Sequence, residues 1–289
     1  MKTFLDCIPC FVRQALDSVR LVTNDETIHE QVLKHVLHVA GQMDLSQSPA
    51  AMGQYIHQHI RRLTGRNDPY RKIKDKFNQQ ALKLFPDLKI RIQKSSEPLE
   101  TAIRLAIAGN IIDFGVNSRL DESDVLKAVE HAIIAPLNGS VKEFSAVVQN
   151  AENILYLADN AGEIVFDRLL LEQLPAEKIT MVVKGSPIIN DATMIDAEVT
   201  GITEVVKVID NGSDAPGTIL DTCSGSFRKH FAAADLVIAK GQGNYETLSD
   251  VEKDIFFLLK VKCFVIAKHI GCPVDSLVLL RSKYGKDNG

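Results

Sequence analysis

Two carboxylates and an amide in the second half of the chain have the chemistry of a ligand set for a hard cation. Asp159 and Asn160 directly follow an apolar run at 154–158, and Asp191 follows a second apolar run at 179–184. Such runs are typical of buried parallel strands, and open α/β sheets bind their ligands at the carboxyl ends of the strands. Carboxylate and amide oxygens are the ligands that Mg²⁺ and Mn²⁺ prefer. We therefore expect Asp159, Asn160 and Asp191 to share one divalent cation.

A simpler interpretation exists for the two aspartates. Aspartate is a common residue at the start of a helix, where its carboxylate accepts a hydrogen bond from a main-chain N–H group of the first turn. Helical patterns are expected at 163–172, shortly after Asp159, and at 191–198, which begins with Asp191 itself. From the sequence, helix capping and cation binding are both open for these residues.

A glycine-rich segment with a lysine follows a third apolar run, at 236–239. Lys240, Gly241 and Asn244 lie in this segment, which leads into a predicted helix. A helix N-terminus beside a glycine-rich loop can bind phosphate through main-chain N–H groups, although the segment matches neither the Walker motif nor GxGxxG. We expect Lys240, Gly241 and Asn244 to bind a phosphate group.

Two further charged side chains are expected at the same site. Lys262 lies in an apolar segment at 256–267, where a charged group is costly unless it meets an anion. Lys262 is therefore predicted to be a second phosphate contact. Glu163 begins the helical pattern that follows Asp159 and Asn160, and we count it among the residues that line the substrate site.

The first half of the chain contributes one polar pair to the predicted site. Asn110 and Asp113 interrupt an otherwise apolar stretch, between Gly109 and Gly115, at the end of a predicted helix. Buried polar groups need hydrogen-bond partners, and a neighbouring active site could supply them. The alternative is an ordinary helix terminus with a glycine stop. We expect Asn110 and Asp113 to line the site from the helical half.

Cys7 and Cys10 form a CxxC motif at the start of the first predicted helix. Such a motif can lower the pKa of a thiol or supply half of a metal site, but small buried thiols that pack a helix are the simpler interpretation. The sequence contains no second CxxC motif. The five cysteines of the chain are an odd number, which fits free thiols in a reducing compartment better than a disulfide framework.

The composition is that of an ordinary globular protein, and it excludes several classes. Apolar residues make up 45% and charged residues 24% of the 289 positions, enough for a sizeable core. The net charge of −4 argues against a dedicated nucleic-acid-binding protein. No apolar run is long enough to span a membrane, and we do not expect the first residues to act as a signal peptide, because Asp6 interrupts them and no sustained apolar stretch follows. We expect a cytoplasmic protein with no nucleic-acid or membrane partner.

The elements that must position these residues fall into two patterns. Up to residue 150, apolar residues recur at helical spacing in segments 11–22, 27–40, 49–63, 70–85, 98–110 and from 121 onward. Pro86 is expected to end the fourth of these helices. From residue 151, short apolar runs alternate with helical patterns. The predicted strands are 154–158, 179–184, 205–209, 236–239 and 263–267, and the predicted helices between them are 163–172, 191–198, 217–233 and 245–253.

This alternation predicts an α/β fold with a mainly parallel sheet that is covered on both faces by helices. We place a helical N-terminal domain at 1–150 and an α/β domain that binds metal and phosphate at 151–289. In this arrangement the predicted site residues of the second half lie on the loops that follow the strands.

In order and spacing, these motifs resemble the DUF89 family of damage-control phosphatases, whose metal-binding domain is called ARMT1-like. The resemblance covers nearly the whole chain and includes the CxxC motif typical of an archaeal and bacterial subgroup. It extends over the Asn110 and Asp113 segment, the Asp159–Glu163 segment, Asn190-Asp191, the Lys240–Tyr245 segment and Lys262.

The resemblance implies a helical N-terminal region packed on a Rossmann-like three-layer domain. It also implies a divalent cation (Mn²⁺, Co²⁺, Ni²⁺ or Mg²⁺) held by Asp159, Asn160 and Asp191, and hydrolysis of phosphate monoesters of small metabolites, which can be damaged ones. One motif differs: the Arg-Thr-x-Lys sequence of the sugar-phosphate branch is Leu-Lys-Val-Lys at 259–262, so that only Lys262 is retained.

We therefore predict a metal-dependent phosphomonoesterase that acts on a small phosphorylated metabolite. Asp159 is either a cation ligand or a nucleophile in this prediction. Two alternatives stay open from the sequence. One is an S-adenosylmethionine-dependent carboxyl methyltransferase, although no glycine-rich loop follows the run at 154–158. The other is a metal-binding module without catalytic activity. The oligomeric state is not predicted.

Overall fold

In this computed structural model, which describes residues 1–109 and 122–284, seven strands form one sheet. The strand order across the sheet is β1-β7-β6-β5-β2-β3-β4. The strands are β1 (Leu137–Gly139), β2 (Ile154–Leu157), β3 (Ile179–Val183), β4 (Lys207–Asp210), β5 (Leu236–Lys240), β6 (Ile255–Lys260) and β7 (Leu277–Arg281). Within these residues β7 is antiparallel to β6, and the other paired strands are parallel. The prediction of a mainly parallel sheet is confirmed.

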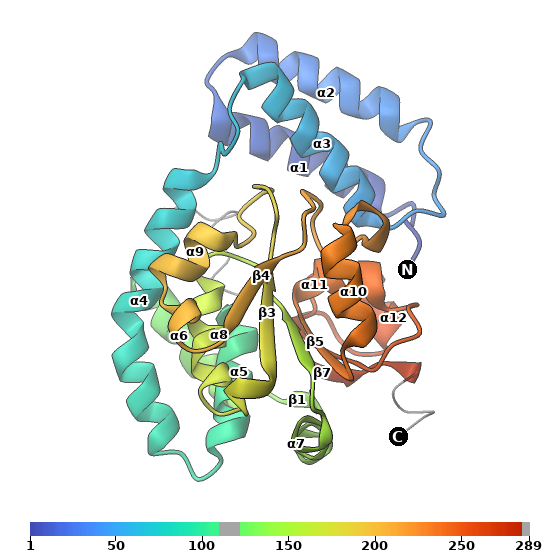
Figure 1. The fold of residues 1–289 in the computed structure, drawn as a ribbon. Helices are drawn as coiled ribbons and strands as arrows, with labels where there is room; N and C mark the ends of the chain where they lie inside the picture. Colours follow the sequence, from blue (N-terminus) through green and yellow to red (C-terminus); the bar gives the residue numbers. More distant parts are fainter. Residues whose placement is uncertain (110–121, 285–289) are drawn as a thin grey trace.

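The central strands are apolar along their whole length because both faces of the sheet are covered. In β2, Ile154 and Tyr156 pack into the core on one face, whereas Leu155 and Leu157 pack into the core on the other. This division follows from the two-residue period of a strand. The three layers are visible in Figure 1.

One face of the sheet is covered by helices from both halves of the chain, and the other face only by late helices. The first face carries α4 (Arg71–Gln93), α5 (Pro98–Gly109), α6 (Glu122–Ile134), α7 (Val141–Asn150), α8 (Glu163–Leu171) and α9 (Met194–Val199). The second face carries α10 (Gly225–Ala233), α11 (Gly241–Leu248) and α12 (Phe264–Ile270). The two layers lie on opposite sides of the sheet in Figure 1.

The first three helices form a separate unit with its own apolar core. This three-helix unit consists of α1 (Cys7–Val22), α2 (Glu26–Ala40) and α3 (Pro49–Thr64). It lies above the loops that follow the carboxyl ends of β3 and β4, as Figure 1 shows. The helical N-terminal region is thus packed on the α/β layers, as predicted.

The predicted end of a helix at Pro86 is wrong, because α4 continues through Pro86 to Gln93. Proline removes one helical hydrogen bond and usually ends or kinks a helix. Here Leu84 and Leu88, on either side of the proline, are buried in the core, whereas Pro86 itself is exposed to solvent. Burial of the apolar stripe on both sides of the proline therefore keeps the helix continuous.

The predicted strand at 263–267 is also wrong, since α12 occupies this segment and β6 lies before it. The segment 255–267 is apolar almost throughout, and a short apolar run has no periodicity that separates a buried strand from a buried helix. Strands β1, β6 and β7 were not predicted. Because β1 precedes residue 150, the boundary that we placed at 150 does not coincide with the edge of the sheet.

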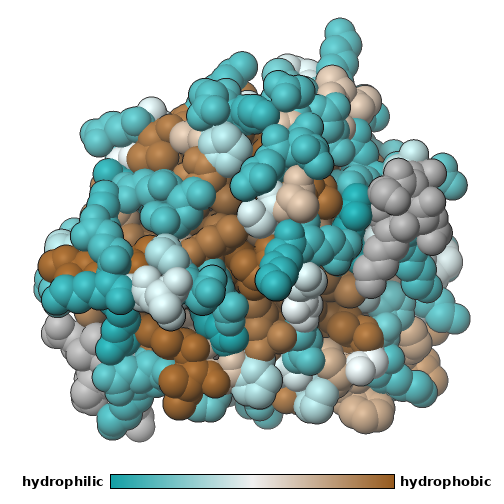
Figure 2. Space-filling view, turned by 90° about the horizontal axis from the view of Figure 1, so that it is seen from below, coloured by the Kyte–Doolittle hydropathy of each residue, from teal (hydrophilic) through white to brown (hydrophobic). Residues whose placement is uncertain are grey.

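The surface at the end of the molecule opposite the three-helix unit is mixed. Figure 2 shows this end, where hydrophilic side chains surround smaller apolar patches. Among the residues described, no helix has the length and apolar character needed to cross a membrane.

Candidate metal and phosphate site

The loops after β2 and β3 bring the three predicted cation ligands together. Asp159 and Asn160 follow β2 directly, and Asp191 lies in the loop after β3. Main-chain hydrogen bonds join the two loops, from Ala161 N–H to the Asn190 carbonyl (2.8 Å) and from Ala192 N–H to the Asp159 carbonyl (2.8 Å). Asn160 and Asp191 form an isolated antiparallel bridge between these bonds. The backbone therefore fixes the separation of the three side chains.

The simpler interpretation of the aspartates as helix caps is wrong. The residue before α8 is Gly162, and the residue before α9 is Thr193, whose hydroxyl and main-chain N–H both bond to Asp196. Asp159 and Asp191 each lie two or more residues before these positions. Neither aspartate is therefore an N-cap residue, and both lie at the carboxyl edge of the sheet.

The side chain of Asn160 is held in one orientation by two carboxylates. Its amide nitrogen donates to Oδ2 of Asp159 (3.0 Å) and to Oε2 of Glu163 (2.9 Å). A primary amide has two N–H groups, and both are used here. The amide carbonyl oxygen is therefore the atom of Asn160 that can serve as a cation ligand.

The carboxylate of Asp159 lies against the first residue of α11. A Cβ atom on Gly241 would lie 1.8 Å from Oδ2 of Asp159, and the φ angle of Gly241 is +78°. Both the close approach and the positive φ require glycine. The predicted glycine-rich segment thus places the start of a helix against the carboxylate.

The charges around Asp159 favour a cation. Burial raises the pKa of Asp159 well above its usual range, and the Glu163 and Asp191 carboxylates raise it further. The ammonium groups of Lys262 and Lys184 oppose this rise. A divalent cation would relieve the repulsion among these carboxylates, and the donor set of two carboxylates and one amide suits a hard ion.

The asparagine is part of the candidate ligand set. Within residues 1–109 and 122–284, no three His, Cys, Asp or Glu side chains are arranged to hold a metal ion by themselves. Asp159 and Asp191 are two such side chains, and a site built on them would need a third protein ligand of another type. Asn160, which lies between their loops, is the candidate for that ligand.

Lys240 was predicted to contact phosphate, but its ammonium group is fully engaged below the site. The side chain is 0% exposed, and Nζ lies 2.6 Å from Oε1 of Glu163 and 2.6 Å from Oδ1 of Asp167. Nζ also donates to the main-chain carbonyl of Ala106 (2.8 Å). These three bonds use all three N–H groups of the ammonium. We therefore assign Lys240 to the support of Glu163.

Glu163 links this buried network to the predicted cation ligands. It is almost fully buried, with one carboxylate oxygen bonded to Asn160 and the other to Lys240. Asp167 also accepts from the Tyr156 hydroxyl (2.8 Å), and burial raises its pKa to about 6 despite Lys240. An acidic residue next to Asn160 is thus kept in place by a buried lysine.

The other predicted phosphate contacts lie in different settings. The amide of Asn244 is buried and donates to the carbonyls of Ala158 (3.3 Å) and Lys240 (2.8 Å), so it joins the ends of β2 and β5. The side chain of Lys262 is exposed at the site, where its charge acts on Asp159. Asn110 and Asp113 lie outside the described residues.

Lys184, at the end of β3, was missed by the sequence analysis. Its Nζ lies 3.4 Å from Oδ2 of Asp191 and donates to the carbonyl of Gly217. Lys184 was assigned to a strand end, and only its position before the glycine at 185 could have drawn attention to it. The buried network of Glu163, Asp167 and Lys240 was also missed. The sequence signal for it was Asp167, a charged residue on an otherwise apolar helix face.

The three-helix unit holds the loops that surround the site. Gln54, Gln58 and Arg61, on α3, all bond to the carboxylate of Asp214, in the loop after β4. Arg61 also donates to the main-chain carbonyl of Pro187 (2.7 Å), in the loop that carries Asp191. One face of α3 therefore fixes two of the loops at the carboxyl edge of the sheet.

The chain is similar to known proteins over almost its whole length. Residues 3–278 match the family described as the damage-control phosphatase ARMT1-like domain. An uncharacterized protein of Methanocaldococcus jannaschii is 38% identical, over 96% of this chain and 94% of that protein. A damage-control phosphatase of Pyrococcus horikoshii is 34% identical, over 98% and 99% of the two chains.

A damage-control phosphatase of Archaeoglobus fulgidus is 35% identical, over 96% of this chain and 98% of that protein. Among solved structures, a DUF89 family protein from Pyrococcus horikoshii superposes with a TM-score of 0.89 at 35% identity. That match covers 98% of this chain and 100% of the other.

Proposed function

Because this chain belongs to the damage-control phosphatase ARMT1-like family and is therefore a hydrolase, we propose that it releases phosphate from phosphate monoesters of small metabolites at the edge of the sheet. The observation that supports this site is the meeting of Asp159, Asn160 and Asp191 beside the ammonium groups of Lys184 and Lys262. Family membership favours the phosphatase over the methyltransferase and over a module without activity.

In this proposal Asp159, Asn160 and Asp191 hold one divalent cation. Mn²⁺, Co²⁺, Ni²⁺ and Mg²⁺ are the ions to which such oxygen ligands are suited. When bound, the ion supplies positive charge and Lewis acidity to the phosphoryl group. We assign Asp159 to cation binding.

The residues of the chain then divide the remaining work. The exposed ammonium of Lys262 binds phosphate oxygens, and Lys184 adds positive charge on the Asp191 side of the site. Glu163 orients the Asn160 amide so that its carbonyl can face the ion, and the buried Lys240 holds the Glu163 carboxylate in place. The site thus combines a preformed ligand set with charges that are in place before substrate binds.

The test is phosphate release from 4-nitrophenyl phosphate in the presence of each of the four ions. We expect D159N to reduce kcat/KM by about a hundredfold or more, because it removes one charged ligand. The matched control is D221N, which changes an exposed aspartate in the loop after β4 and leaves the rate unchanged. Calorimetric titration with Mn²⁺ should show a weaker site in D159N only. Full activity of D159N would contradict the assignment.

A further inference from the structure

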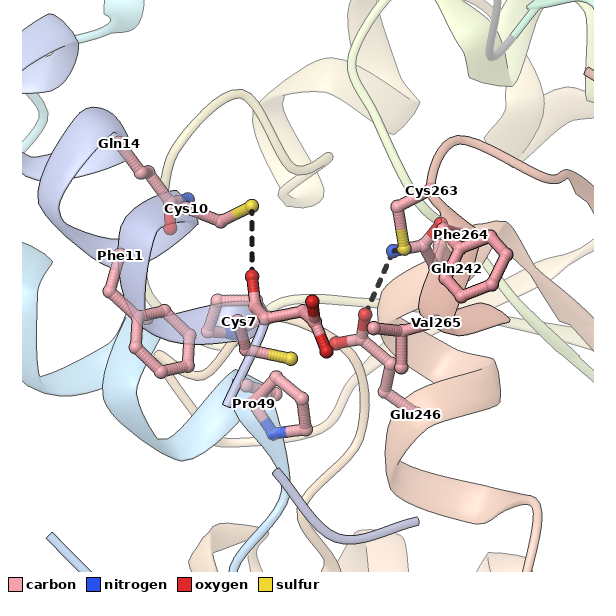
Figure 3. Close-up of a pocket in the computed structure, with 14 residues that line it drawn as sticks. Cys7, Cys10, Phe11, Gln14, Pro49, Gln242, Glu246, Cys263, Phe264 and Val265 are labelled. Atoms are coloured by element: carbon pink, nitrogen blue, oxygen red, sulfur yellow. Dashed lines mark hydrogen bonds between the residues drawn. The ribbon is translucent and has the colours of Figure 1, made fainter. Parts of the chain in front are cut away.

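A cavity of about 390 Å³ lies between the three-helix unit and the last helices of the chain. Figure 3 shows Cys7 and Cys10 of α1 on one side and Gln242, Glu246 and Cys263 on the other. These three thiols are free cysteines. The cavity therefore separates two parts of the structure that are far apart in the sequence.

Two residues that line the cavity are neighbours in the chain of residues at the candidate metal and phosphate site. Gln242, which lines it, follows Gly241, the residue that touches the Asp159 carboxylate. Cys263, which also lines it, follows Lys262. The side-chain carbonyl of Gln242 accepts a hydrogen bond from the main-chain N–H of Lys262 (3.3 Å). Gln242 and Cys263 therefore connect the cavity to Lys262, through one hydrogen bond and one peptide link.

The charge of the cavity is opposite to that of the phosphate site. Its charged lining residues are Asp6 and Glu246, and among the residues described none of its lining side chains is lysine, arginine or histidine. The Met1 ammonium donates to the main-chain carbonyl of Glu246 (2.6 Å), but it pairs with the carboxylate of Asp250 (3.2 Å). Burial raises the pKa of Glu246, and the hydrogen bond from Gln242 and the Met1 ammonium offset only part of this rise.

Apart from the amides of Gln14 and Gln242, the rest of the lining consists of apolar residues and thiols. Phe11, Phe264 and Val265 contribute apolar surface, and burial raises the pKa values of Cys7 and Cys10, which keeps these thiols neutral at neutral pH. Such a surface binds the uncharged body of an organic molecule. A second anionic group would face the carboxylates of Asp6 and Glu246 with no cationic side chain among the described lining residues, which is an effective means of rejecting a ligand.

We propose that this cavity receives the alcohol part of the phosphate monoester, and that it selects alcohols that are neutral or carry an ammonium group against alcohols with a second anionic group. This inference rests on the proposed phosphatase function and adds the class of substrate. The phosphate is recognised by the cationic side of the site, and the alcohol by the acidic side.

Three phenyl phosphates of similar size test the selection. They carry hydroxymethyl, aminomethyl or carboxyl groups at the 4-position, and phosphate release is measured at pH 8 with saturating Mn²⁺. We expect kcat/KM for the carboxyl ester to be about tenfold or more below that for the other two esters. Equal values, or a preference for the carboxyl ester, would overturn the inference.

Two variants separate a charge effect from intrinsic reactivity. E246Q keeps the size of the side chain and its hydrogen bond to Gln242, and it should reduce the discrimination to about threefold or less. E252Q removes the same charge at an exposed position outside the cavity and should leave the discrimination unchanged. Unaltered discrimination in E246Q would count against the inference.

A second measurement does not depend on turnover. Cys10 is exposed and lines the cavity, whereas Cys272 lies outside its lining. In the Mn²⁺-loaded enzyme, 4-hydroxybenzyl alcohol should slow labelling of Cys10 by a maleimide severalfold relative to Cys272, and 4-hydroxybenzoate should not. Labelling that neither compound slows would overturn the inference. Failure to hydrolyse any of the three esters would instead contradict the proposed phosphatase function.

Discussion

Replacement of Lys240 by methionine should destabilise the protein strongly, and the loss should depend on pH. The ammonium is fully buried and lies 2.6 Å from a carboxylate oxygen of both Glu163 and Asp167. Methionine fills a similar volume but leaves two carboxylates buried without a cation. Breaking a buried ion pair by removal of one partner typically costs about 3–5 kcal/mol, so we expect K240M to lower the free energy of unfolding at pH 8 by at least about 3 kcal/mol.

The pH dependence follows from Asp167. Burial raises its pKa to about 6 in the folded protein, and loss of the Lys240 ammonium raises that pKa further above the unfolded value. A raised folded pKa contributes stability that is present at low pH and lost as the pH rises. The deficit of K240M relative to the wild type should therefore shrink as the pH falls from 8 to 5.

Urea unfolding followed by circular dichroism at pH 5, 6.5 and 8 measures this deficit. The matched control is K229M on the exposed face of α10, which should change the free energy of unfolding by less than about 0.5 kcal/mol. The triple variant K240M/E163Q/D167N should recover most of the loss, since it removes the uncompensated charges as well. A loss below about 1 kcal/mol at pH 8, or one that is the same at all three pH values, would refute the reasoning.

Two other variants test contacts at the edge of the sheet. G241A should abolish metal-dependent phosphate release and lower the free energy of unfolding by about 1 kcal/mol or more. The added methyl group would meet the Asp159 carboxylate, and the φ angle at residue 241 is positive. G225A, where the added methyl group meets nothing within 4 Å, is the control for both assays. D214N should lower the free energy of unfolding by about 1–3 kcal/mol at pH 7, because it removes the charge that Arg61 binds. Hydrogen bonds from Gln54 and Gln58 and the Arg61 charge lower the pKa of Asp214 against the effect of burial. The stability difference between D214N and the wild type should therefore disappear as the pH falls below about 4. A stability difference that persists in acid urea titrations would argue against the Arg61–Asp214 ion pair.

Much of the arrangement of the site was predictable because it depends on local patterns. Strands β2, β3 and β5 are apolar runs with abrupt ends, and parallel strands end at a common edge. The convergence of Asp159, Asn160 and Asp191 follows from these two facts. Their roles as ligands stay a prediction that D159N tests.

The role of Lys240 was not predictable from its surroundings in the sequence. A lysine before a glycine at a strand end is compatible with phosphate binding, and only the fold shows that its side chain turns toward Glu163 and Asp167, more than 70 positions earlier. The strand error at 263–267 has a related cause. An apolar run without periodicity indicates that the segment is buried, but contacts with distant elements decide whether it forms a strand or a helix.

The bonds from α3 to the loops have a consequence for how this enzyme can be cut or recombined. A fragment that begins with α4 would retain every strand of the described sheet, but the carboxylate of Asp214 and the carbonyl of Pro187 would lose the Arg61 guanidinium. The loop that carries Asp191 would then be released from one of its supports while the sheet stayed intact. We therefore expect loss of the three-helix unit to weaken the site without unfolding the sheet, and a swap of that unit between relatives to require a matching residue at 214, since the bond to residue 187 uses only its main-chain carbonyl.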